Sequence, residues 1–418
     1  MATRPTLAES MKRRNGFVLV NIAISATVLL AIVGLAIDTG YLQFVKTRMQ
    51  AAADAAALGG AQEIKLNGAA NVVAATRADA ALNGFTNGVN TVTVTVNTPP
   101  ASGAYTSSSS AVEAIVSQNV GTLFMQLLGF ASVTVRARAV ARQGPGTNAL
   151  YTLSPSAPSS FSAVGGVAVT LAGGVMIDSS SATALNVTNG SVVSAASFSV
   201  VGKYTNPVLS GASITPTPVT GASAASDPLA YVPAPTATGA CLQTNYSIGN
   251  GKSATLNPGV YCNGIGIAGG ATVAMNPGTY VLRGGGLTVS NGATLSGTGV
   301  TIYNTQGTGL AYGAVSLLGG VVVQLTAPTT GSLAGILFFQ DRGVASALVN
   351  TFSNGSTSKF TGSLYFPTTA LSYTGGASGA YTIIVANTVG FSGGVIVKSD
   401  YSSLPGGSPV RGNAMLSE

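Results

Sequence analysis

An uninterrupted apolar segment near the N-terminus is the feature that most constrains this chain. Residues 17–37 are 21 residues without a charged side chain. As a helix this segment would be about 31 Å long, close to the roughly 30 Å hydrocarbon thickness of a bilayer. The basic run KRR at 12–14 precedes the segment, and Asp38 follows it. Because basic residues favour the cytoplasmic side, we expect a single-pass membrane protein with everything after Tyr41 across the membrane.

The sequence after this span predicts that the helix continues as a rigid stalk. Residues 41–58 contain neither Pro nor Gly, and small apolar residues recur there at three- and four-residue spacing. Small residues let a neighbouring helix approach closely, and polar side chains within a span can bond across to it. We therefore expect side-by-side packing with like helices, with a plain membrane tether as the alternative. The residues expected in that packing are Asn21, Ser25, Asp38, Ala53 and Asp54.

The N-terminal residues also carry a motif with a fixed order. Arg13-Arg14 and Gly16 precede the span, Asp38 and Gly40 follow it, and the run ADAAA occupies residues 53–57. In this order the region resembles the TadE/TadG-like proteins of Flp (tight adherence) pilus assembly. The resemblance implies a component of pilus assembly, or a pilus-associated protein, in the bacterial inner membrane. It also implies that the N-terminal helix contacts other pilus-assembly membrane proteins.

The Gly16-Phe17 step resembles a prepilin-peptidase cleavage site. Pilins usually carry Glu five residues after the cut, whereas this chain has Asn21. Three alternatives therefore stay open. The chain is cleaved after Gly16, it keeps residues 1–16 as part of a permanent signal anchor, or it carries a secretory signal that ends at Gly34-Leu35-Ala36.

The composition excludes several kinds of site. The chain has no His, so the usual zinc ligand sets and any Ser-His or Cys-His dyad are impossible. Its net charge of +7 is too dispersed for a nucleic-acid surface. We expect no cofactor and no metal. In an oxidising periplasm, Cys241 and Cys262 are expected to form one disulfide, with two buried free thiols as the alternative.

The chain after the stalk predicts two further regions. Following the tail, anchor and stalk of residues 1–61, residues 62–146 predict a small α+β, pilin-like unit. Its expected strands and short apolar helix are, in chain order, strand 91–97, strand 112–118, helix 120–128 and strand 132–142. From residue 147 to 401, short apolar runs are separated by Gly-Gly or Asn-Gly a little over 20 residues apart. This texture predicts a parallel β-helix in a mainly β chain, with a β-sandwich as the alternative.

Two segments are expected to depart from the solenoid pattern. Residues 206–240 contain six prolines and predict a strap on the surface of the solenoid. Residues 402–418 predict a flexible tail. The added aromatic residues after Val300 predict broader coils and a wider core towards the C-terminus.

The few acidic residues after position 146 weigh against an enzyme. A β-helix polysaccharide hydrolase or lyase needs clustered carboxylates, whereas those of this region lie far apart in the sequence. They are Asp178, Asp227, Asp341, Asp400 and Glu418. Asp341-Arg342 is expected to form a loop salt bridge or turn.

We therefore expect a non-enzymatic, membrane-anchored component of, or protein associated with, Flp/Tad pilus assembly. Its β-helix is expected to be periplasmic or extracellular and to contact the envelope, other cells or glycans. The alternatives are an adhesin-like surface protein without a pilus role and a β-helix polysaccharide-active enzyme.

Overall fold

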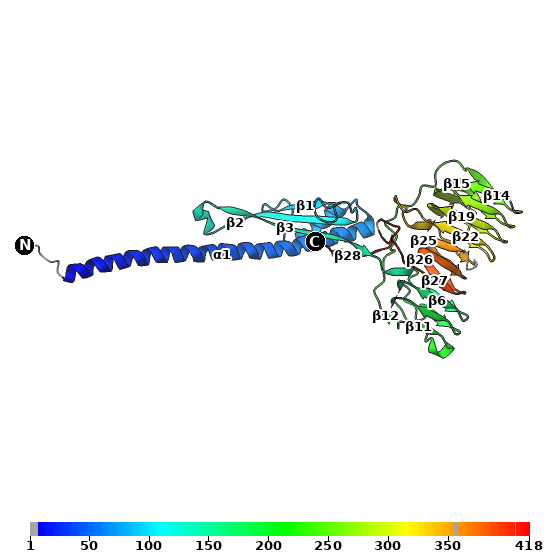
Figure 1. Ribbon diagram of the computed structural model, residues 1–418, viewed down its shortest axis with the longest axis horizontal. Coiled ribbons are helices and arrows are strands. Elements are labelled where there is room, and N and C mark those ends of the chain that lie inside the picture. The colour runs from blue at the N-terminus through cyan, green and yellow to red at the C-terminus, as the bar shows by residue number, and fades with distance from the viewer. Residues whose placement is uncertain (1–6, 354–357, 406) are drawn as a thin grey trace, which may run out of the picture. The chain divides into compact units, whose positions relative to one another are not determined.

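The computed structural model describes residues 7–353, 358–405 and 407–418. The chain is mainly β. The chain divides into two compact units (Figure 1). The N-terminal unit comprises residues 1–143 together with 413–418, and the solenoid unit comprises residues 144–412.

One long helix and a small sheet make up the N-terminal unit. Helix α1 (Leu7–Asn67) is continuous, and the short helix α2 (Val72–Leu82) follows it. The strands are β1 (Thr93–Asn97), β2 (Ala111–Gly121), β3 (Ser132–Pro145) and β28 (Arg411–Leu416), in that order across the sheet. Strands β1, β2 and β3 pair antiparallel. The C-terminal half of α1 buries small apolar residues in the same core as α2, β1, β2 and β3.

The alternating strand pattern is confirmed by burial. Val92 and Val94 are buried, whereas Thr93 and Thr95 are exposed, so one face of β1 meets the core. The expected helix over 120–128 is wrong in extent. Strand β2 continues to Gly121, and only a 3₁₀ turn, η1 (Met125–Leu128), follows. Val120 and Gly121 pair with β3 and so stay in the strand, and the turn ends at Gly129, whose φ of 94° is left-handed.

The flexible tail predicted for residues 402–418 is wrong. Residues 411–416 form β28 beside β3, and the Val140 N–H donates to the Glu418 carbonyl at 2.7 Å. The Glu418 carboxylate also accepts from Arg138 Nη1 at 2.8 Å. The tail is ordered because β3 offers it an unpaired edge and a partner charge, neither of which is visible in the tail's own sequence.

The solenoid unit is a parallel β-helix, as the turn-punctuated sequence predicted. One ladder contains, in spatial order, β13 (Gln243–Ile248), β15 (Gly259–Ile267), β17 (Gly278–Arg283), β20 (Val300–Thr305), β23 (Ile336–Gln340), β25 (Lys359–Tyr373), β26 (Gly376–Phe391), β4 (Asn148–Thr152), β7 (Gly174–Ile177), β10 (Phe198–Val200) and β12 (Val219–Thr220). A second contains β14 (Ser253–Leu256), β16 (Thr272–Met275), β19 (Thr294–Thr298), β22 (Val322–Thr326), parts of β25 and β26, then β27 (Val395–Val397), β6 (Ala168–Leu171), β9 (Val192–Ser194) and β11 (Ser213–Thr215). The third contains part of β15, then β18 (Leu287–Val289), β21 (Val315–Leu317), β24 (Val349–Phe352), parts of β25 and β26, β5 (Phe161–Val164) and β8 (Leu185–Thr188).

The coils are not stacked in chain order. Strand β26, near the end of the chain, pairs in parallel with β4 and β5, and β27 pairs with β6. The first coil therefore lies in the middle of the stack. Figure 1 shows β14 and β15 at one end of the solenoid, β11 and β12 at the other, and β25, β26 and β27 beside β6 between them.

This order explains part of the Pro-rich segment and corrects two expectations. The strap predicted for residues 206–240 is wrong at its start, because β11 pairs with β9 and β12 pairs with β10 as a last coil. After β12 the chain has reached one end of the stack, and it must return to the opposite end before β13 begins. The aromatic coils predicted to widen the core towards the C-terminus therefore lie in the middle of the stack. There Phe338 packs against Phe352, Phe360 and Phe366, with ring centroids 5.3–6.5 Å apart.

The Asn-Gly corners have the backbone conformation that their sequence predicts. Asn189 and Gly190 have φ values of 55° and 75°, and Asn291 and Gly292 have 52° and 74°. Both residue types tolerate this left-handed region, so they turn the chain between short strands.

Candidate functional site: the apolar helix and its contacts

Helix α1 exposes the apolar side chains of its N-terminal half. In the described part of the chain, Val18–Ile64 is the one helix long and apolar enough to cross a membrane, and only 6% of its most apolar window is buried. Large apolar side chains between Val18 and Ile37 are exposed all around the helix. Such a surface is unfavourable in water and requires an apolar environment.

Asp38 joins the end of this apolar surface to the β2–β3 hairpin. Its carboxylate accepts backbone N–H bonds from Leu123 (2.9 Å), Phe124 (2.8 Å) and Met125 (2.6 Å). The carboxylate is buried beneath the connection between β2 and β3, residues 122–131, which we term the apolar loop. Three charge-assisted hydrogen bonds therefore fix the loop to α1.

A glycine one helical turn before Asp38 makes room for the apolar loop. Gly34 is buried, and a Cβ at this position would lie 2.6 Å from Cδ1 of Phe124. The ring of Phe124 therefore lies directly against the helix backbone at Gly34. Gly34 and Asp38 act together as a seat for the loop.

The buried alanines of α1 face the interior of their own unit; they are Ala52, Ala53, Ala56, Ala57 and Ala61. Ala53 is fully buried in the core with α2 and the sheet, and Asp54 accepts from Gln50 Nε2 at 2.8 Å. The small residues thus allow close packing within the chain. The close approach extends to Gly60, where a Cβ would lie 2.2 Å from Thr76 Oγ1 on α2.

The remaining residues predicted for helix packing lie in the span. Asn21 and Ser25 are on exposed parts of α1. Gly16 and Phe17 belong to α1, but their side-chain surroundings lie outside the described residues. Whether the chain is cut between them stays a prediction.

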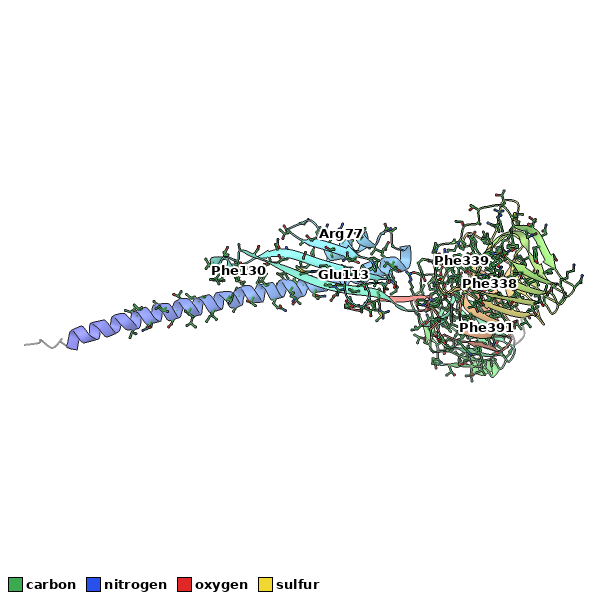
Figure 2. The ribbon with its side chains drawn as sticks, turned by 45° about the horizontal axis from the view of Figure 1, so that its top comes forward. Arg77, Glu113, Phe130, Phe338, Phe339 and Phe391 are labelled. Atoms are coloured by element: carbon green, nitrogen blue, oxygen red, sulfur yellow. A yellow bond between two sulfur atoms is a disulfide. The ribbon has the colours of Figure 1, made fainter. Side chains whose placement is uncertain are left out.

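A buried carboxylate holds the sheet of the N-terminal unit to its neighbouring loop. Glu113 on β2 is fully buried and accepts from Asn97 Nδ2 (2.6 Å), the Ala101 N–H (3.1 Å) and Arg138. Burial opposes ionisation of Glu113, but these hydrogen bonds outweigh it and lower the pKa of the carboxyl. Figure 2 shows Glu113 within the sheet and Phe130 at the tip of the hairpin.

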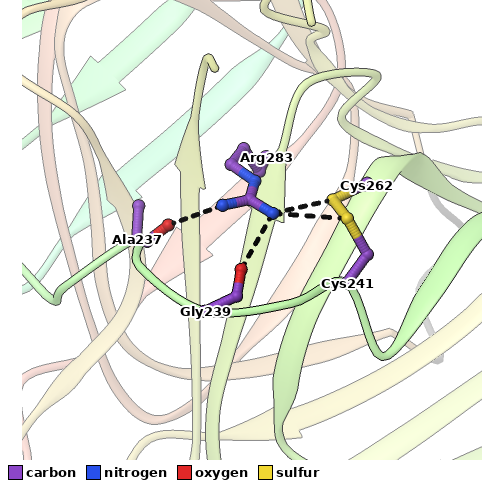
Figure 3. Close-up of a disulfide and its surroundings, with 5 residues drawn as sticks. All are labelled: Ala237, Gly239, Cys241, Cys262 and Arg283. Carbon is purple, nitrogen blue, oxygen red and sulfur yellow. Dashed lines mark hydrogen bonds between the residues drawn. A yellow bond between two sulfur atoms is a disulfide. The ribbon is translucent and has the colours of Figure 1, made fainter. Parts of the chain in front are cut away.

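The predicted disulfide is present in the solenoid unit. Cys241 and Cys262 are bonded and lie 21 positions apart in sequence (Figure 3). Arg283 from β17 donates to the carbonyls of Ala237 and Gly239 at 3.1 Å each, and its Nη2 lies 3.3 Å from both sulfur atoms. The end of the Pro-rich strap is thereby fastened to the face of the β-helix.

The strap is also fastened near its middle. Leu229 and Val232 are buried against the outer face of the first ladder, among aromatic side chains that include Phe339 and Tyr365. Arg342 donates to the carbonyls of Leu229 (2.6 Å) and Val232 (3.1 Å). The guanidinium also lies 4.9 Å from the centroid of Phe339.

The acidic residues of the solenoid unit have separate structural contacts. Asp227 lies 3.9 Å from Arg342, Asp178 accepts from the Ala225 N–H at 2.9 Å, and Asp400 caps the Ser402 N–H at 3.0 Å. Asp341 accepts from the Gly343 N–H at 2.9 Å, which is the turn expected for Asp341-Arg342. The partner of Arg342, however, is Asp227 of the strap and not the adjacent aspartate.

Comparison with known proteins bears on the N-terminal helix. Residues 18–63 match the family model described as putative Flp pilus-assembly TadE/G-like. The resemblance of the N-terminal region is thus confirmed over the stretch that contains the apolar surface, Asp38 and Ala53. No curated protein and no solved structure matches the chain.

Sequence reasoning missed two features of the N-terminal unit. It did not foresee the apolar loop on Asp38, although residues 119–135 contain no charged residue and that absence is a readable signal. It also did not foresee the Glu113–Arg138 pair, because the two residues are brought together only by the β2–β3 register, which places Arg138 opposite Ile115.

Proposed function

We propose that this protein is a single-pass inner-membrane component of, or protein associated with, a Flp/Tad pilus assembly system. The observation that carries the proposal is that one helix is both the TadE/G-like segment and the exposed apolar surface. The basic residues before the span favour a cytoplasmic N-terminus. The rest of the N-terminal unit and the solenoid unit would then lie in the periplasm or outside the cell.

The proposed role of the β-helix is contact with the envelope, another cell or a glycan. On the second ladder the outward positions of successive coils carry uncharged residues such as Ser253, Thr272 and Thr294, so these coils stack without repulsion between like charges. The disulfide and the two arginine clamps stiffen its strap, which suits a domain that works outside the cytoplasm.

A topology experiment tests the anchor. Full-length protein carries an epitope tag at either end and is expressed in its native cells, which are then converted to spheroplasts and treated with protease. We expect loss of the C-terminal tag and survival of the N-terminal tag. Protection of both tags, or recovery of the chain with soluble cytosolic protein, overturns the proposal.

A genetic experiment tests the pilus role. Deletion of the gene should abolish surface pili, and complementation with the full chain should restore them. Normal pili with reduced attachment would favour the adhesin-like alternative. Turnover of a polyuronate by the purified protein would favour the polysaccharide-active enzyme.

A further inference from the structure

We propose that the apolar loop, residues 122–131, inserts into the lipid surface beside the end of the α1 span, as a second membrane contact of the N-terminal unit. The proposal rests on the membrane anchor proposed above. The loop would contact the boundary between lipid headgroups and acyl chains, in the leaflet where the span ends.

The apolar loop exposes large apolar side chains to solvent. Leu127 is 81% exposed and Leu128 72%. Leu123, Phe124 and Phe130 are also exposed, by 41–65%. Since no charged residue occurs between Glu113 and Arg136, no charged side chain of the loop opposes transfer into lipid.

The position of the loop along α1 places it at membrane depth. Phe124 lies against Gly34 and the loop backbone binds Asp38, so the loop is level with the last turn of the apolar span. Tyr41 and Phe44, just beyond on the helix, are also exposed. Aromatic side chains at this level are typical of the membrane–water interface.

The loop also satisfies backbone groups that would be costly to bury in lipid. Asp38 accepts three of its N–H groups. Within the loop, Thr122 N–H donates to the Ala131 carbonyl, Leu127 N–H to Phe124 and Phe130 N–H to Met125, at 3.1–3.2 Å. The amide of Gln126 turns back to the Leu123 carbonyl at 2.8 Å. Internal pairing of this kind is what the hydrocarbon region demands of backbone.

Continuity with the span favours lipid over a protein partner. The exposed apolar side chains of the loop adjoin those of α1 around Gly34, so both belong to one surface, and most of that surface belongs to the proposed span. An amphipathic segment lying at the interface would reach roughly 5–10 Å into the headgroup region, which a single 3₁₀ turn can span.

Depth-dependent fluorescence quenching tests the proposal on the full chain. Leu127→Cys is labelled with an environment-sensitive fluorophore and reconstituted into phosphatidylcholine–phosphatidylglycerol vesicles that carry a nitroxide either near the headgroup or near the end of the acyl chain. The native cysteines are disulfide-bonded, so only the introduced thiol reacts. Leu128→Cys repeats the measurement at a second exposed site. Leu82→Cys, 84% exposed at the end of α2, is the matched control, and Val28→Cys reports the span.

We expect the label at position 127 or 128 to lose emission to the shallow nitroxide more than to the deep one. Position 28 should be quenched most by the deep nitroxide, and position 82 by neither. Quenching at 28 without quenching at 127 and 128 overturns the loop proposal and leaves the anchor intact, including the case in which a protein shields the loop. Absence of quenching at 28 overturns the anchor itself.

Discussion

The ring of Phe161 packs against the ring of Phe391, with centroids 5.4 Å apart, although the two residues come from the first and last complete coils of the solenoid in chain order. Phe161 lies on β5 and Phe391 at the end of β26, which pair in parallel at this point. The contact joins the coils made early in the chain to those made late. Both side chains belong to the solenoid core, into which Figure 2 places Phe391.

Phe161→Ala and Phe391→Ala should each destabilise the solenoid unit strongly. Both rings are buried, and truncation of a buried Phe costs about 3–5 kcal/mol. Because the rings contact each other, the double variant should show a coupling of about 0.5–1.5 kcal/mol. Urea unfolding measures all three values. Leu209→Ala, at a side chain 88% exposed, is the control and should change stability by less than about 0.5 kcal/mol. Additive single effects would show that the two coils do not depend on each other.

Reduction of the disulfide should loosen the end of the strap. In the chain-entropy model, closing a loop with Cys241 and Cys262 21 positions apart stabilises the fold by about 3 kcal/mol. The double variant Cys241→Ser, Cys262→Ser should lose about that much in urea unfolding, and its strap should become more sensitive to protease. Arg283→Ala, which removes the clamp and keeps the disulfide, separates the two contributions. If the double variant matched the wild type in stability, the disulfide would be dispensable.

The N-terminal unit should lose stability in acid through Glu113. The pKa of this carboxyl is lower in the folded chain than its ordinary value of 4.5, so its ionised form stabilises the fold above pH 4.5. That contribution is lost as the pH falls through the folded pKa. Glu113→Gln should therefore be less stable than the wild type at pH 7, and the difference in unfolding temperature should shrink as the pH falls below about 4. A constant difference across this range would contradict the assignment.

Two glycines of α1 should respond differently to substitution by alanine. At Gly60 a Cβ would lie 2.2 Å from Thr76 Oγ1 and 2.9 Å from Val112 Cγ1, so Gly60→Ala should cost about 1–3 kcal/mol through overpacking. At Gly40 a Cβ meets no described atom within 4 Å, so Gly40→Ala should be neutral or stabilising by up to about 1 kcal/mol. Thermal unfolding in detergent compares them. Equal effects would mean that α1 and α2 are not packed this closely.

Much of the fold could be predicted because it depends on local patterns. The alternation of Val92 and Val94 with threonines fixes the face of β1, and Asn189-Gly190 turns the chain because both residues accept positive φ. The apolar span is readable because length and lack of charge suffice to identify it. The disulfide is readable because the chain has only two cysteines.

The features that were missed depend on partners distant in sequence. No local pattern shows that β26 pairs with β4 and β5. Every coil carries similar short apolar runs, so the sequence does not distinguish which two coils are neighbours. The tail is ordered by Arg138 and the edge of β3, and the loop at Phe124 by Asp38. In each case the decisive group lies on another element.

The position of the strap determines what an incomplete chain would look like. A polypeptide that stopped before β26 would have formed the coils that begin with β4 and those that begin with β13, but the two stacks would face each other across a missing layer. Each would show an open row of backbone donors and acceptors where β26 belongs. Strand β26 joins the two stacks, and it lies close to the C-terminus. During synthesis the open strand edges therefore stay available for mispairing until almost the whole chain has been made.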